Sequence, residues 1–305
     1  MNPESLKEAD APRPYHVPVM RDEVLWMLRP RPRGTYVDCT VGGGGHAAAV
    51  LEHAGPGAFL VGIDKDPEAI ECAGRMLGRF PGAFKLVQGS YADLAVILAG
   101  LGITRVDGVL FDLGVASHQF DDARRGFSYM SDGPLDMRMN PGEGLSAYDL
   151  VNGLSAEALA RILREYGEER WASRIARFIV DRRKRGPITT TAELVDVIKQ
   201  AIPAGARRSG PHPAKRSFQA LRIAVNDELR SLSRGLDQAV DVVGPGGRIV
   251  VIAFHSLEDR MVKRKFSESR NCLRTITVRA LTPCDEELTA NPRSRSARLR
   301  AAQRF

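Results

Sequence analysis

A glycine-rich loop between a predicted strand and a predicted helix constrains the fold of this chain more than any other feature. The run Thr35-Tyr36-Val37 is β-like, residues 42–45 are four consecutive glycines, and the small residues from Ala47 to Leu51 favour a helix. Such a loop holds nucleotide-like cofactors in α/β folds, because glycine adopts positive φ angles and lets a ligand touch the backbone. A second strand-like run ends at Asp64, where an acid commonly binds ribose hydroxyls. We therefore expect a cofactor that contains adenosine.

Strand and helix patterns alternate along the first third of the chain and then give way to helices. Strands are expected at residues 35–39, 59–63, 84–88, 106–111 and 248–254, and the first three connections contain helices at 46–53, 67–78 and 92–100. This alternation predicts an α/β fold with a Rossmann-like parallel sheet and right-handed crossovers. Helical patterns then cover 155–165, 168–183, 191–201 and about 214–240.

The interruption of the strand pattern predicts a discontinuous domain organisation. We expect a sheet domain made of residues 15–134 and 211–305, with a helical domain of residues 135–210 inserted into it. The polar, proline-rich residues 1–14 are expected to form a disordered leader.

Composition excludes several classes of protein. No apolar run approaches the roughly 20 residues that span a bilayer, so no membrane association is expected and the cytosol is the expected compartment. The four cysteines form no Cys-x-x-Cys pair and are expected to be free thiols. The six histidines are scattered and no acidic cluster has ligand spacing, so no metal is expected.

Positive charge concentrates in the C-terminal segment. From Arg260 to Phe305 there are 12 Lys and Arg against 4 Asp and Glu, an excess of +8, whereas the net charge of the whole chain is +7. Such a segment favours a polyanionic partner, although a solvated basic face would look the same in the sequence.

Two cofactors fit the glycine loop. The pattern Gly42-x-Gly44-x-x-Ala47 with Asp64 is that of a dinucleotide site, and the register Asp38-x-Thr40-x-Gly42-x-Gly44 is that of an S-adenosylmethionine site in which Thr40 replaces a glycine. A carboxylate at Asp38 attracts a sulfonium and an ammonium but repels a pyrophosphate. The charge therefore favours S-adenosylmethionine, while a dinucleotide-dependent oxidoreductase stays open as an alternative.

Several longer motifs are distinctive. They are Asp112-Leu113-Gly114-Val115-Ala116-Ser117-His118-Gln119-Phe120-Asp121, Arg125-Gly126-Phe127-Ser128, Gly133-Pro134-Leu135-Asp136-Met137-Arg138-Met139, Tyr166-Gly167-Glu168-Glu169-Arg170, His212-Pro213-Ala214-Lys215-Arg216-Ser217-Phe218, Phe254-His255-Ser256-Leu257-Glu258-Asp259-Arg260 and Asn291-Pro292-Arg293-Ser294-Arg295-Ser296. With these motifs the chain resembles the bacterial 16S ribosomal RNA cytosine-N4 methyltransferase family from His16 to near the C-terminus. The resemblance implies S-adenosylmethionine as methyl donor and a cytidine of the decoding region in 16S rRNA, within the small ribosomal subunit, as acceptor. It also implies that the inserted helical domain helps to bind RNA.

The resemblance also assigns cofactor-binding residues where the family motif matches this sequence. These residues are Gly44, Gly45, His46, Asp64, Tyr91, Asp112 and Gln119. His118 departs from the family's usual proline before that glutamine, which affects the expected shape of the loop.

The catalytic residues are less constrained by the sequence. A methyl acceptor must lie in line with the sulfur–methyl bond, and a proton acceptor must lie near the cytosine amine. Asp112 is the first candidate because it ends a strand beside the donor, Asp136 is the second, and Arg138 is expected to hold a phosphate or the base. Many amino-methylating enzymes carry Asp/Asn/Ser-Pro-Pro-aromatic where this chain has Asp112-Leu113-Gly114-Val115, so that motif does not identify the proton acceptor.

Further residues have two interpretations each. Tyr129, Phe127 and Phe218 are candidates for stacking on a flipped base between loops 121–144 and 212–218, with core packing as the alternative. The segment 255–259 either contacts substrate or starts a helix capped by Ser256. The sequence also leaves open a non-catalytic RNA-binding factor, and whether the chain acts as a monomer or a homodimer.

Overall fold

The parallel sheet predicted from the alternating pattern is present in the computed structural model, which describes residues 18–207 and 210–305. The expected leader, residues 1–14, lies outside these described residues. The helices and strands of the first part are α1 (Arg21–Leu28), β1 (Thr35–Asp38), α2 (Gly45–Ala54), β2 (Phe59–Asp64), α3 (Pro67–Leu77), β3 (Phe84–Gln88), α4 (Leu94–Gly100) and β4 (Val106–Asp112). Those that follow the inserted helices are α12 (Glu228–Val242), β5 (Val243–Ala253), α13 (Ser256–Glu268), β6 (Leu273–Thr275), α14 (Asp285–Ala290) and β7 (Arg298–Arg304).

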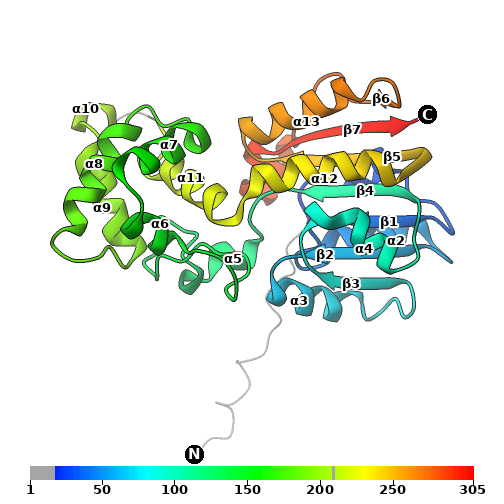
Figure 1. Cartoon of the computed structure of the whole chain (residues 1–305). Helices are drawn as coiled ribbons and strands as arrows, with labels where there is room; N and C mark the ends of the chain where they lie inside the picture. Colours follow the sequence, from blue (N-terminus) through cyan, green and yellow to red (C-terminus); the bar gives the residue numbers. More distant parts are fainter. Residues whose placement is uncertain (1–17, 208–209) are drawn as a thin grey trace, which may run out of the picture.

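The seven strands form one sheet in the order β3-β2-β1-β4-β5-β7-β6 (Figure 1). The first five pair in parallel, with Val37 opposite Val61 on one side and Val109 on the other. The strand β7 is antiparallel to both β5 and β6. The α/β prediction is thus confirmed. The antiparallel β7 also distinguishes this sheet from the strand order 3-2-1-4-5-6 of dinucleotide-binding folds.

The sheet is buried on both faces, which explains why its strands read as nearly continuous hydrophobic runs. One face packs on α1, α2 and α3, and the other packs on α4, α12 and α13. Neighbouring residues of β4 alternate between the two cores: Val109 and Phe111 belong to one, and Leu110 to the other. The crevice for a ligand is expected at the carboxyl ends of β1 and β4, where the strand order reverses.

The insertion forms a separate helical lobe beside the carboxyl ends of the strands (Figure 1). Its helices are α5 (Ser117–Asp121), α6 (Ala147–Gly153), α7 (Ala156–Gly167), α8 (Ala172–Arg183), α9 (Thr191–Ala201), α10 (Ala204–Arg207) and α11 (Lys215–Asn226). The hydrophobic core of this lobe runs from Phe127 to Leu221, so it extends beyond both expected limits, 135 and 210. In particular, α11 packs on α7 as part of the lobe.

The expected long helix over about 214–240 is wrong, because the structure has two helices there. Asp227 adopts a left-handed conformation (φ 52°) and ends α11, and α12 begins at Glu228. The break turns the chain from the helical lobe back onto the sheet (Figure 1).

Two further findings complete the description of the chain. No helix among the described residues is long and apolar enough to span a membrane. The four cysteines are free thiols.

Candidate active site

Three aspartates lie at the carboxyl ends of adjacent strands. Asp38 is the last residue of β1, Asp64 of β2 and Asp112 of β4. Because β1 is paired with both β2 and β4, the three carboxylates lie along the same edge of the sheet. The sequence analysis selected all three.

The glycine loop between β1 and α2 lies directly beside these carboxylates. Gly42 and Gly44 have positive φ angles of 50° and 85°, and the amide of Gly42 donates to Asp64 Oδ2 over 2.9 Å. A Cβ on Gly44 would lie 3.2 Å from the Cα of Ala73 in α3, so a larger residue would separate the loop from that helix. No side chain caps the start of α2. Its first amide groups are therefore free to receive a carboxylate of a ligand.

Thr40, which replaces a glycine of the expected pattern, has a structural role. Its hydroxyl Oγ1 accepts a hydrogen bond of 2.7 Å from the amide of Asp112, and its own amide donates to Asp38 Oδ1 over 3.2 Å. Thr40 therefore joins the end of β1 to the end of β4 and holds the two aspartates at one place. The sequence analysis noted the replacement but missed this role, because the partner is 72 residues away.

Asp38, Asp112 and His46 form a mostly buried cluster. Asp38 is 2% exposed, His46 is 6% exposed, and His46 Nε2 lies 3.5 Å from Asp112 Oδ2. Burial raises the pKa of Asp38 to about 7, against the opposing effect of His46. Burial lowers the pKa of His46, but Asp112, Asp38 and Glu287 outweigh it, so the net pKa is raised.

This cluster contains buried polar atoms without a hydrogen-bond partner among the described residues. They are Nδ1 and Nε2 of His46 and Oδ1 of Asp112. Buried polar groups are nearly always paired, so unpaired ones at the mouth of a crevice indicate a place where a ligand supplies the partner. Carboxylates with free acceptor positions fit an ammonium and a sulfonium, as in S-adenosylmethionine. They do not fit the pyrophosphate of a dinucleotide, which Asp38 would repel.

Two predicted cofactor residues lie at the sides of the crevice. Tyr91 packs edge-to-face on Phe111, with ring centroids 5.6 Å apart, and against Gly235 of α12. Gln119 is 3% exposed, and its amide is already engaged: Nε2 donates to Asp66 Oδ2 over 2.6 Å and Oε1 accepts from the amide of Ala116 over 3.0 Å. The role of Gln119 toward the cofactor stays a prediction.

Asp66 and Arg125 form a buried ion pair that the sequence analysis missed. Asp66 is fully buried and also caps α3, and Arg125 donates to Asp66 Oδ2 over 2.8 Å and to the backbone carbonyl of Met139 over 2.9 Å. The pair thus ties the segment before the helical lobe to the sheet domain. The only signal in the sequence was the presence of Arg125 in a distinctive motif.

Asp136 and Arg138, the other catalytic candidates, are paired with each other. The guanidinium of Arg138 contacts both carboxylate oxygens of Asp136, at distances from 2.7 to 3.2 Å. The backbone carbonyl of Asp136 accepts from Ala147 at the start of α6. These contacts place Asp136 at the base of the helical lobe, and its carboxylate already has a cationic partner. Asp112 therefore stays the first candidate for the proton acceptor.

The segment after β5 forms a helix cap, and the capping residue is His255 instead of Ser256. His255 Nδ1 accepts from the amide of Glu258, and Glu258 Oε2 accepts in return from the amides of Phe254 and His255. Ser256 donates from its hydroxyl to Glu168 of the helical lobe over 2.7 Å.

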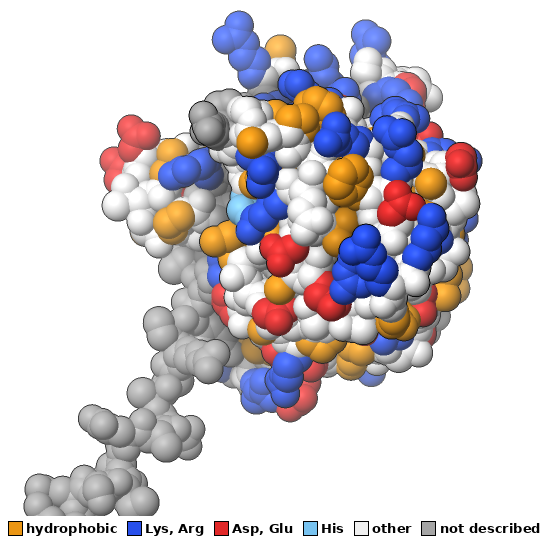
Figure 2. Space-filling view, turned by 90° about the vertical axis from the view of Figure 1, so that its left-hand side faces the viewer, with side chains coloured by type: hydrophobic (Ala, Val, Ile, Leu, Met, Phe, Trp, Pro, Cys, Tyr) orange, Lys and Arg blue, Asp and Glu red, His pale blue; other side chains and the backbone are white. Residues whose placement is uncertain are grey.

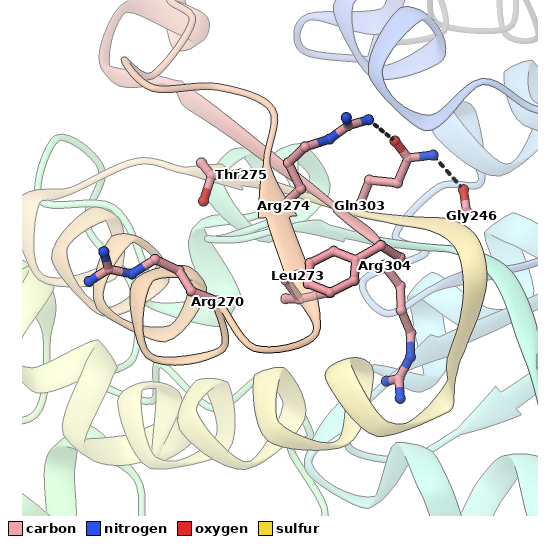
Figure 3. A pocket seen from close by; sticks show the side chains of 8 residues that line it. Gly246, Arg270, Leu273, Arg274, Thr275, Gln303 and Arg304 are labelled. Atoms are coloured by element: carbon pink, nitrogen blue, oxygen red, sulfur yellow. Dashed lines mark hydrogen bonds between the residues drawn. The ribbon is translucent and has the colours of Figure 1, made fainter.

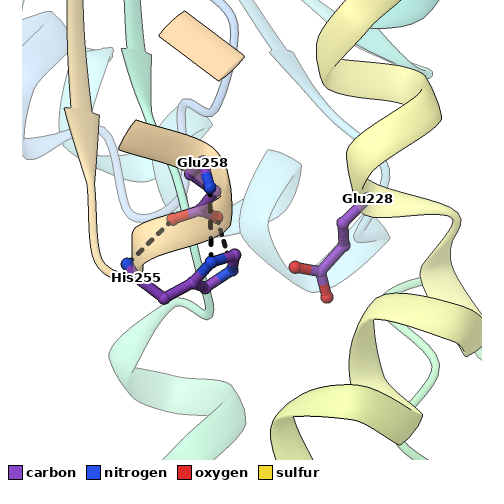
Figure 4. Close-up of side chains that lie close together, drawn as sticks. All are labelled: Glu228, His255 and Glu258. Atoms are coloured by element: carbon purple, nitrogen blue, oxygen red, sulfur yellow. Dashed lines mark hydrogen bonds and ion pairs between the residues drawn. The ribbon is translucent and has the colours of Figure 1, made fainter. Parts of the chain in front are cut away.

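His255 and Glu258 lie close to Glu228 of α12, and the three offer a group of metal-ligand atoms within 4.8 Å of one another (Figure 4). Arg222 contacts both carboxylate oxygens of Glu228, at 2.8 and 2.7 Å. Burial opposes ionisation of Glu258, but His255 and Arg222 outweigh it and its pKa is lowered. The carboxylates are thus compensated by protein groups, and we assign the cluster a structural role between α12 and α13.

The two loops expected to form the base pocket meet through the ring of Tyr129, which contacts both His212 and Phe218. Tyr129 stacks on His212 with ring centroids 4.8 Å apart, which brings loops 121–144 and 212–218 together. Phe127 and Phe218 are 4% and 3% exposed and belong to the core of the lobe. Of the three aromatic candidates, only Tyr129 is partly exposed, and its ring already stacks on His212.

Comparison with known proteins agrees with this geometry. Residues 13–305 match the MraW methylase family. A protein of Heliobacterium modesticaldum named Ribosomal RNA small subunit methyltransferase H is 51% identical over 309 residues, which cover 95% of this chain and 99% of the relative. Proteins with the same name from Geobacter sulfurreducens and Pelobacter propionicus are 52% and 53% identical, again over 95% of this chain and over 99% and 98% of their own lengths.

Proposed function

Since this chain belongs to the MraW methylase family, we propose that it transfers a methyl group from S-adenosylmethionine to the exocyclic N4 of a cytidine in the decoding region of 16S rRNA. The name shared by its relatives supports small-subunit rRNA as the substrate. The N4 atom and the decoding-region position rest on the motif resemblance. The expected acceptor is the rRNA within the small ribosomal subunit.

One structural observation carries the proposal. Asp38, His46 and Asp112 gather at the ends of β1 and β4, and buried polar atoms of His46 and Asp112 have no hydrogen-bond partner among the described residues. An acidic cluster at this place suits a cofactor whose reactive end is cationic.

The residues around the crevice have distinct roles toward this cofactor. We assign Asp38 and Asp112 to its cationic end, the free amides of Gly45 and His46 at the start of α2 to its carboxylate, and Asp64 to the ribose hydroxyls. Gly44 allows close approach of the ligand, and Tyr91 and Gln119 are assigned to the adenine side by the family resemblance.

When bound, S-adenosylmethionine supplies an electrophilic methyl group on a positively charged sulfur. The amine of cytosine is a poor nucleophile because its lone pair is delocalised into the ring. Asp112 Oδ1 has no hydrogen-bond partner among the described residues, so we assign it to accept a hydrogen bond from N4–H. As N4 gains the methyl group it loses a proton, and Asp112 Oδ1 receives that proton. His46 lies at the other oxygen, Oδ2, and holds the carboxylate in orientation.

The target cytidine must leave any base pair or stack to reach this crevice. Tyr129, which stacks on His212, is positioned to receive the flipped base at the lobe side. Figure 2 shows Lys and Arg side chains spread over the outer face of the helical lobe, and exposed basic residues on α7 and α8 include Arg161, Arg164, Arg174 and Arg177. We assign this face to the phosphate backbone of the RNA.

The test uses purified protein and labelled S-adenosylmethionine. Small subunits that lack the modification, free 16S rRNA and large subunits are each offered as acceptor. The proposal predicts transfer to small subunits at the highest rate, with none to large subunits. Cofactor binding without transfer to any RNA would instead establish a non-catalytic RNA-binding factor, and binding of a nicotinamide dinucleotide alone would establish an oxidoreductase.

A further inference from the structure

A group of arginines surrounds the end of the sheet that lies away from the cofactor crevice. Arg270, Arg274 and Arg304 line a groove of about 740 Å³ beside β6, together with Gln303 of β7 and Gly246 near the start of β5 (Figure 3). From Arg248 to Ala253, β5 continues toward the crevice for about 17 Å at 3.3 Å per residue. The groove is therefore a separate place from the site of methyl transfer.

Two of the basic side chains, Arg248 and Arg274, lie on one face of the sheet with Gln303 between them. Arg248 is paired with Gln303, and Gln303 is paired with Arg274, so the three side chains form a row across β5, β7 and β6. Arg29, at the C-terminal end of α1, lies near this row, because Arg248 donates to the carbonyl of Met27 over 2.6 Å.

None of these arginines has a carboxylate partner among the ion pairs of the described residues. Arg274 donates to Gln303, Arg270 donates to Ser267, and Arg304 donates to the carbonyl of Val240. Most other arginines of the tail are compensated: Arg300 and Arg298 both contact Asp259, for example. The uncompensated part of the basic tail is thus concentrated around β6.

Arg248 lies among positively charged neighbours. Arg248 is 8% exposed, and its pKa is lowered by burial and by two charged neighbours, Arg29 and Arg274, both of them positive. The C-terminal end of α1 offsets only part of this charge, since a helix end carries roughly half an elementary charge. An anion at this place would relieve the repulsion between the three arginines.

We propose that Arg29, Arg248 and Arg274 bind phosphate groups of the RNA backbone at a second contact remote from the methyl acceptor; Arg270 and Arg304 lie on the other face of the same sheet edge, the face that packs on α12 and α13. The guanidinium group matches phosphate through two parallel hydrogen bonds. Several cations gathered at the β6 edge of the sheet fit the repeated negative charges of a polynucleotide. The identification of RNA as the partner rests on the proposed function, whereas the phosphate chemistry of the site does not.

The test compares two double variants of the full-length protein. The double variant Arg29→Gln/Arg274→Gln removes the two exposed arginines of the proposed phosphate site. Arg75→Gln with Arg79→Gln is the matched control, because those arginines of the α3 region are paired with Glu71 and Glu52. Affinity for small subunits and for free 16S rRNA is measured as a function of salt concentration.

Loss of two phosphate contacts should lower the affinity about tenfold near 100 mM salt and reduce the slope of log K against log salt by about 1.4 to 1.8. The affinity for S-adenosylmethionine and the kcat at saturating RNA should match those of the control. The unfolding midpoint without RNA should not fall, because the substitutions remove repulsion.

An affinity and slope equal to those of the control would overturn the inference and leave the arginines only the role of keeping the edge strand from pairing with other chains. Binding of inorganic pyrophosphate to the same variants is measured as well. If the Arg29→Gln/Arg274→Gln variant loses pyrophosphate binding but keeps its affinity for RNA, the inference is also overturned. A protein that needs these arginines to bind RNA but never methylates would contradict the proposed function and leave this inference intact.

Discussion

Asp38, His46 and Asp112 lie close together at the ends of β1 and β4. His46 faces Asp112 at 3.5 Å, and the pKa values of both Asp38 and His46 are raised. Glu287 of α14 and Asp64 of β2 add further negative charge around them. The titrations of Asp38, whose pKa is raised to about 7, and of His46, whose pKa is raised, should therefore be coupled.

The affinity for S-adenosylmethionine should rise between pH 6 and pH 8. Below about pH 7 the carboxyl of Asp38 is neutral, and below its own raised pKa His46 is cationic; both states disfavour a cation. Both protons are lost as the pH rises, so the affinity gains up to about tenfold per pH unit for each proton released. Calorimetry in two buffers of different protonation enthalpy would count those protons.

S-adenosylhomocysteine, which lacks the sulfonium charge, should show a weaker pH dependence. His46→Gln should reduce the number of protons released, and His53→Gln, an exposed position of the same helix, is the control. Equal proton release for both ligands would show that the cluster does not respond to the sulfonium.

Asp112→Asn should lower the rate of methyl transfer by about 100-fold or more while the protein stays folded. The amide of asparagine keeps the shape of the side chain but does not take the proton from N4, and general-base groups contribute roughly 10²–10⁴-fold. Single-turnover transfer to small subunits measures the effect.

Asp136→Asn is the informative comparison, since the carboxylate of Asp136 is already paired with Arg138. It should leave the chemical step within a few-fold of the wild type. The reverse result, with Asp136 essential and Asp112 dispensable, would show that the proton acceptor is Asp136 at the base of the helical lobe.

At the scale of elements, the start of α3 controls how the helical lobe is attached to the sheet. Asp66 caps α3, and it receives Gln119 of α5 and Arg125 from the segment that enters the lobe. The other connection is the break between α11 and α12 at Asp227, beside which Lys65 donates to the carbonyl of Asn226 over 3.0 Å. The two attachments lie at neighbouring residues, 65 and 66, directly after β2.

Arg125→Met should destabilise the protein by about 3 kcal/mol, because it removes a buried cationic partner of the fully buried Asp66. Arg124→Met is the matched control: its side chain is 86% exposed in its pair with Asp122, and no measurable change is expected. Urea unfolding followed by intrinsic fluorescence would compare them, with Trp171 reporting on the lobe. Equal urea midpoints for the two variants would show that the ion pair of Asp66 and Arg125 does not hold the segment before the helical lobe in place.

At the scale of the whole molecule, the parallel strands were predictable from sequence because each is a short apolar run that ends at an aspartate or a turn. The strands β6 and β7 were not predicted, since β7 contains Arg298, Arg300 and Arg304 and depends on pairing with β5 for its position. The broken helix was missed because the apolar period continues through Asp227, and only its left-handed backbone conformation interrupts it.

The candidate site, like the fold, was predictable where its residues lie at the ends of parallel strands. Residues at strand ends, such as Asp38 and Asp112, could be selected from local sequence, because parallel strands bring their carboxyl ends to one edge. The pair of Asp66 and Arg125 spans 59 residues, and Thr40 finds its partner across 72, so only the folded structure reveals them. Asp136 was the second candidate in the sequence, and its pairing with Arg138 now separates it further from Asp112.

The central claim is that the acidic cluster beside the glycine loop directs a methyl group to the amine of one cytidine. It is tested most directly by mass spectrometry of nucleosides from small-subunit rRNA after a single turnover with isotopically labelled S-adenosylmethionine. The account predicts labelled N4-methylcytidine at a single decoding-region position, and its loss with Asp112→Asn. Label on a ring carbon, on a ribose or on another base would contradict it.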